Sequence, residues 1–159
     1  MSLSTDYIGR VVDIDIFGIN TDEVVQDATL SFGAGNVIAG SYKEAQKFVR
    51  ILLSDTDSLQ AQPTYGGGLF KRLNQGTISN RAQFEIFFTQ AKARTLSFMR
   101  MAKAKGGSRD PRFLEDEALK DVAIRSIHIT PGSFKLVLKF TFVDPDADII
   151  IPVGISVGT

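Results

Sequence analysis

Few residues in this chain of 159 amino acids belong to the types that usually carry out catalysis. The sequence contains no cysteine and one histidine, His128. This excludes disulfides, thiolate nucleophiles and any metal site with two imidazole ligands. His128 stands between Ile127 and Ile129 in an alternating segment, so its side chain points to the face opposite both. We therefore expect His128 on the surface, no catalytic residue and no enzymatic activity.

Two carboxylate clusters are of the kind that a wall-degrading glycosidase uses. Asp13 and Asp15 are two residues apart, and Glu115, Asp116 and Glu117 are consecutive. Glycoside hydrolysis needs a pair of carboxyl groups, one of which has a raised pKa. The first pair lies on the polar face of a predicted strand, and the second cluster lies in a polar joint. We expect solvated charge at both places, and the glycosidase remains a minor alternative.

A third acidic cluster resembles a cation site. Asp144, Asp146 and Asp148 alternate around Pro145, but a twelve-residue calcium loop would also need a glycine at its sixth position and a glutamate at its twelfth. Neither is present. The pattern therefore predicts a turn, and we expect neither a bound metal nor a cofactor.

The run Gly66-Gly67-Gly68 before a predicted helix could cradle a phosphate group. However, the sequence lacks the Gly-x-x-x-x-Gly-Lys-Ser/Thr pattern that makes such a loop specific. The three glycines more simply predict a tight turn at which the backbone comes close to another element.

Charge is distributed unevenly along the chain. Residues 61–109 contain nine lysines and arginines but one acid, Glu85, for a net charge of +8, whereas residues 1–60 carry −5 and residues 110–159 carry −3. A basic middle segment suits nucleic acid or an acidic protein partner. Because no aromatic-rich recognition motif accompanies the charge, a small nucleic-acid-binding module is kept only as an alternative, and no nucleic acid is expected.

The hydrophobic pattern predicts helices in the middle of the chain and strands at both ends. Residues 134–143 are the clearest strand, because five apolar side chains alternate with the other positions. A phase slip at Arg125-Ser126 indicates a bulge in the preceding strand, and Pro152 places the last strand at a sheet edge. Strands are expected at 10–19, 28–39, 122–130, 134–143 and 149–157, and helices at 41–53, 69–74 and 81–104.

These elements predict an α+β fold in which central helices pack on a small antiparallel C-terminal sheet. We expect a single domain over 1–159, with residues 1–40 as an N-terminal strand extension and 41–159 as the core. No apolar stretch approaches the roughly 20 residues of a membrane span, and the first residues lack a signal-peptide pattern. The protein is therefore expected to begin in the cytoplasm and to have no contact with a membrane.

The order of these features resembles a known family. A Pro63-Thr64-Tyr65-Gly66 element precedes a short amphipathic piece, a long helix, two strands around a proline turn, and an Asp-x-x-x-Asp-Ile element at 144–149. This order is similar to that of the sheath-initiator wedge subunits of contractile-tail baseplates, which occur in myophages, phage-derived bacteriocins and type VI secretion systems. The resemblance covers roughly residues 45–156.

The resemblance implies a structural subunit rather than an enzyme. It would be located in the tail baseplate of the virion after assembly in the host cytoplasm, in several copies per particle. Its partners would be the tail sheath protein and other wedge, hub and spike proteins, and it would start sheath assembly by adding a strand to an open sheet edge. The residues expected at the partner interface are Pro63, Tyr65, Gly66, Lys135, Val137, Lys139, Asp148, Ile149, Ile151 and Val153.

Overall fold

The computed structural model describes residues 13–14, 37–56, 59, 61–62, 65–76, 78, 80–105 and 117–157. Contacts divide the chain into two compact units. The first unit comprises Met1–Gln46, Arg109–Ser126 and Val137–Val153, and the second comprises Lys47–Ser108, Ile127–Leu136 and Gly154–Thr159. The expectation of one domain stays a prediction.

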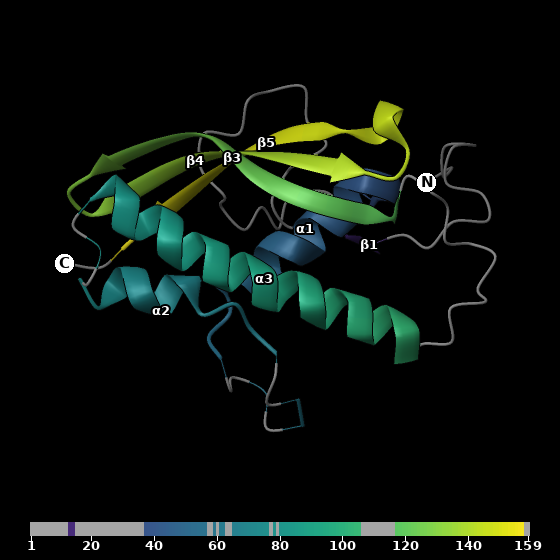
Figure 1. The fold of residues 1–159 in the computed structure, drawn as a ribbon, viewed down its shortest axis with the longest axis horizontal. Helices are drawn as coiled ribbons and strands as arrows, with labels where there is room; N and C mark the ends of the chain where they lie inside the picture. Colours follow the sequence, from purple (N-terminus) through teal and green to yellow (C-terminus); the bar gives the residue numbers. More distant parts are fainter. Residues whose placement is uncertain are drawn as a thin grey trace. The chain divides into compact units, whose positions relative to one another are not determined.

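Three helices form where the sequence predicts them (Figure 1). They are α1 (Gly40–Leu53), α2 (Leu69–Asn74) and α3 (Arg81–Lys105). The backbone N–H of Gln83 donates to the Asn80 carboxamide at 2.9 Å, which caps the first turn of α3. The buried side chains of α3 recur at helical spacing, as expected for one apolar face; they are Phe84, Phe88, Ala91, Thr95, Leu96 and Met99.

The C-terminal strands form a three-stranded sheet in the order β3-β4-β5 (Figure 1). The strands are β3 (Leu119–Thr130), β4 (Ser133–Phe142) and β5 (Ile149–Ser156). The Val143 N–H donates to the Ala118 carbonyl and the Val157 N–H donates to the Gly132 carbonyl, both at 3.0 Å. Each bond joins the end of one strand to the start of its neighbour, so the strands are antiparallel.

One face of β4 is buried, as its alternating sequence predicts. The buried side chains are Phe134, Leu136, Leu138, Phe140 and Phe142. In the second unit, the Phe134 ring stacks on Phe84 of α3, with ring centroids 5.9 Å apart and planes at 21°. Helices packed on a small antiparallel C-terminal sheet confirm the predicted α+β class.

Strand β3 contains two extra residues relative to β4. The strands are joined by the two-residue turn Pro131-Gly132, yet β3 has 12 residues and β4 has 10, and the Val143–Ala118 bond closes their far end. At two places in β3, two consecutive residues are both exposed, whereas regular alternation would bury one of the two. These places are Lys120-Asp121 and Arg125-Ser126. Each pair therefore marks a β-bulge, which confirms the predicted slip at 125–126 and adds a second one.

At the N-terminal side, β1 (Asp13–Ile14) pairs antiparallel with β2 (Val37–Ile38), and Asp13 lies opposite Ile38. Both strands lie within segments that the sequence predicts to be extended. The remainder of the predicted strands at 10–19 and 28–39 lies outside the described residues.

Candidate functional site

The segment between α1 and α2 is bound closely to α1 through its glycines. Gly67 N–H donates to the Ile51 carbonyl at 2.7 Å, and Gly68 N–H donates to the Ser54 carbonyl at 2.9 Å. A Cβ at Gly67 would lie 2.6 Å from the Leu52 carbonyl oxygen. Close backbone approach, the predicted role of this run, is therefore confirmed. The two N–H groups are already donated to protein carbonyls, so they are not directed at a phosphate.

Two of the residues expected at the interface precede this turn. Gly66 has a φ of 104°, and a Cβ there would collide with the Asp55 carbonyl group. The Tyr65 ring is half-buried and meets the Phe98 ring edge-on, with centroids 5.2 Å apart. Both residues therefore support the loop from within the subunit. Pro63 lies outside the described residues.

The acidic cluster at 144–148 forms a turn, as predicted. The Asp146 N–H donates to the Asp144 carboxylate at 3.0 Å at the start of a short 3-10 helix, η3 (Pro145–Ala147). The Asp148 carboxylate accepts the Phe142 N–H at 3.0 Å and lies 3.1 Å from the Lys139 ammonium group. These two donors, the backbone N–H first, hold the pKa of Asp148 below its ordinary value. Within the described part of the chain, no three acidic or histidine side chains gather as a metal site.

The backbone of β5 shows which of its groups face an open edge. Val157 N–H points to β4, and along an antiparallel strand the direction alternates from one residue to the next. The alternating burial of β5 is unbroken, so residues 149, 151, 153 and 155 also face β4. Residues 150, 152, 154 and 156 face the opposite way. Pro152, which has no N–H, therefore lies where no bond to β4 is lost, and the sheet order confirms β5 as an edge strand among the described strands.

This register changes which residues a partner strand would meet. Ile149, Ile151 and Val153 direct their backbone groups to β4, and the side chains of Ile151 and Val153 are buried. The outward N–H groups belong instead to Ile150, Gly154 and Ser156, a shift of one position from the expected residues. The apolar pattern of β5 shows which side chains are buried. It does not show which backbone N–H groups point to β4 and which point outward.

The predicted interface residues on β4 lie on the face opposite its core side chains. Lys135 is exposed, while Val137 and Lys139 are half-exposed. Lys139 and Asp148, both predicted to meet a partner, form an ion pair with each other. His128 on β3 is exposed, which confirms its expected place on the surface.

The expectation that Glu117 is solvated is wrong. Its side chain has no exposed surface, and it accepts a bond from the buried Lys43 ammonium group at 2.9 Å. The Gln46 amide of α1 reaches the Asp13 carboxylate at 3.4 Å in the same unit. The run of three acids indicated a polar loop, but a lysine on α1 offsets the cost of burying one of them.

A basic cavity in the second unit was not predicted as a site. It has a volume of about 250 Å³ and is lined by Thr56, Gly68, Lys71, Arg72, Gln75 and Arg94. The only indication of this cavity in the sequence is the positive net charge of residues 61–109. The convergence of Lys71, Arg72 and Arg94 follows from the packing of α2 beside α3 (Figure 1).

Among the described helices, none has the length and apolar character needed to cross a membrane. Comparison of the chain with protein-family models, curated proteins and solved structures found no match in any of the three.

Proposed function

We propose that the chain is a structural subunit of a contractile-tail baseplate that starts sheath assembly by strand addition, and that it is not an enzyme. The proposal rests on the resemblance described above together with the open edge of β5. In strand addition, backbone groups of an exposed edge provide the affinity and alternate side chains set the register. The sheath protein would supply the added strand, and other wedge, hub and spike proteins would surround the subunit in the virion.

The observation that carries the proposal is the arrangement of outward backbone groups along β5. The N–H groups of Ile150, Gly154 and Ser156 face away from β4, and no described strand pairs with them. Pro152 interrupts this row, so an incoming strand would gain bonds on both sides of position 152 but would find no donor at it. This gap favours one register of the added strand over its neighbours.

The other edge of the sheet is less suited to strand addition. β3 carries two bulges, and exposed Lys120, Asp121 and Arg125 lie at them. Bulges and charges are the features with which proteins prevent pairing at a sheet edge. We therefore assign the added strand to β5.

The proposal is tested by replacing Gly154 with two residues that differ in their N–H. Gly154→Pro removes an outward donor without removing a bond to β4, whereas Gly154→Ala keeps the donor.

The genes adjacent to that of this chain should encode sheath, tube or spike proteins. Purified chain should seed polymerisation of that sheath protein, as observed by sedimentation and negative-stain electron microscopy.

We expect Gly154→Ala to seed sheath as well as the original chain and Gly154→Pro to lose seeding while its circular dichroism and Tm stay unchanged. Seeding by a folded Gly154→Pro variant would count against β5 as the paired edge. Neighbouring genes without any tail component, or a complete failure of the original chain to seed, would refute the baseplate proposal itself.

A further inference from the structure

The basic cavity beside α2 and α3 has the composition of an anion site. Three of its six lining residues are cationic (Lys71, Arg72 and Arg94), two more are the polar side chains of Thr56 and Gln75, and none is acidic. Neither Lys71 nor Arg94 forms an ion pair with a described residue. The one acid between residues 61 and 109, Glu85, is 2.7 Å from Arg81 and is therefore already paired.

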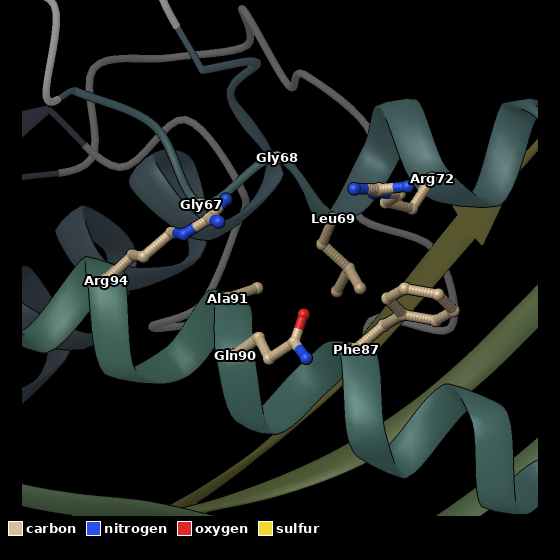
Figure 2. Close-up of a pocket in the computed structure, with 8 residues that line it drawn as sticks. All are labelled: Gly67, Gly68, Leu69, Arg72, Phe87, Gln90, Ala91 and Arg94. Carbon is tan, nitrogen blue, oxygen red and sulfur yellow. The ribbon is translucent and has the colours of Figure 1, made fainter.

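The guanidinium groups come from two helices, α2 and α3. Figure 2 shows Arg94 extending from α3 toward Gly67 and Gly68, and Arg72 of α2 standing over Phe87. The Arg72 guanidinium carbon lies 5.4 Å from the centre of the Phe87 ring, a cation–π distance that restricts the orientation of its planar group. A smaller cavity of about 20 Å³ adjoins the first and shares Gly68, Arg72 and Arg94 with it.

The short turn before α2 contributes Gly68 to the lining of the cavity and is held by backbone hydrogen bonds. Gly67 donates its N–H to the Ile51 carbonyl of α1, and Gly68 donates to the carbonyl of Ser54, the residue that follows α1. A β-carbon at Gly67 would lie 2.6 Å from the Leu52 carbonyl oxygen, so any other residue there would have to displace backbone atoms.

The chemistry of this site favours a carboxylate over a nucleic acid base. Arginine forks bind carboxylate and phosphate oxygens through paired N–H groups. Proteins that bind single-stranded nucleic acid also offer aromatic faces for stacking. No aromatic residue lines the larger cavity; Phe87 lines the smaller one, and the Arg72 guanidinium lies over its ring. The cavity therefore has positive charge but no aromatic surface on which a nucleic acid base could stack.

We infer that this cavity binds carboxylate side chains of an acidic polypeptide segment carried by a partner protein. Lys71, Arg72 and Arg94 would supply the donors, and Gln75 and Thr56 would add neutral hydrogen bonds. The inference does not depend on the baseplate proposal, because it rests on this unit of the chain and on the charge of its lining residues.

The test measures fluorescence anisotropy of a fluorescein-labelled oligoglutamate peptide with the full chain at low ionic strength, where charge attraction is not screened. Arg94→Gln and Lys71→Gln should each weaken binding by about tenfold or more, the loss expected for one charge-assisted hydrogen bond. Arg81→Gln removes the same charge from α3 outside the cavity and should change affinity less than about twofold. All three side chains are exposed, and circular dichroism should be the same for every variant.

Four results would overturn the inference. The first is no binding of oligoglutamate by the original chain, and the second is an equal loss in Arg94→Gln and Arg81→Gln. The third is displacement of the peptide by inorganic phosphate of equal or higher affinity, which would indicate a free-anion site. The fourth is tighter binding of a labelled DNA duplex with the same dependence on Arg94, which would instead favour the nucleic-acid-binding alternative.

Discussion

The Asp148 carboxylate accepts the backbone N–H of Phe142 at 3.0 Å, where β4 ends and the turn to β5 begins. Residues 134, 136, 138, 140 and 142 of β4 direct their N–H groups to β5, by the same alternation that orients β5. Because η3 separates the two strands at this end, the side chain of Asp148 supplies the acceptor for Phe142. The same carboxylate holds Lys139, so one residue closes the hairpin and neutralises a strand lysine.

Replacement of Asp148 by asparagine should destabilise the fold. Asparagine has nearly the same shape but loses the charge that attracts Lys139 and strengthens the Phe142 bond. We expect a lower Tm at neutral pH by circular dichroism. Asp146→Asn, two residues earlier in the same turn at an exposed position, is the matched control and should leave the Tm close to that of the original chain.

The stability that Asp148 contributes should depend on pH in a defined direction. Its folded-state pKa lies below the ordinary value of 3.8, so the folded state favours the charged form. The contribution is therefore fully present above about pH 5 and is lost as the pH falls through about 4 and below. Urea unfolding of the original chain and of Asp148→Asn should give a constant difference in free energy above pH 5 that shrinks on acidification. A difference that grows on acidification would contradict this assignment.

Removal of one partner of the buried Lys43–Glu117 pair should be costly. Glu117→Gln removes the nearer carboxylate of a lysine whose side chain is 8% exposed and leaves it Glu44, at 4.0 Å. Because the loss of a partner from a buried pair costs roughly 3–5 kcal/mol when no other charge remains, we expect a loss below that range. The double variant Lys43→Met with Glu117→Leu removes both charges and should be less destabilised than the losses of the single variants Lys43→Met and Glu117→Leu added together; these three and the original chain form the cycle. Chemical denaturation of all four proteins measures this coupling, and additive losses would show that the two groups do not interact.

Substitution of Gly67 should disturb the turn between α1 and α2. Its φ is not in the left-handed region, so alanine is disfavoured only by contact: the new Cβ would lie 2.6 Å from the Leu52 carbonyl oxygen and 2.8 Å from its Cα. We expect Gly67→Ala to lower the free energy of unfolding by about 2–3 kcal/mol.

Gly76→Ala is the control for this substitution. Gly76 has a φ of 64° but open space around a Cβ, so its cost should be roughly 1 kcal/mol from backbone strain. Equal effects at the two positions would show that the contact with Leu52 relaxes at little cost.

The local elements of this protein were predictable from its sequence. Helices 41–53 and 69–74 and strand 134–143 lie within one residue of α1, α2 and β4, because apolar periodicity and the glycines that end helices act over a few residues. The slip at Arg125-Ser126 and the edge position of Pro152 were also visible, since a bulge breaks alternation and proline cannot donate to a ladder. The α+β class followed from the order of these elements.

Only the tertiary structure decided which distant groups meet. Lys43 and Glu117 are 74 positions apart, and nothing near Glu117 in the sequence distinguishes it from the solvated acids beside it. The cavity joins Thr56, Lys71 and Arg94 from three segments, and the outward positions of β5 depend on one bond from Val157 to Gly132. The physical reason is that periodicity determines which face of an element is apolar, whereas register, burial of charge and cavities depend on how elements pack against one another.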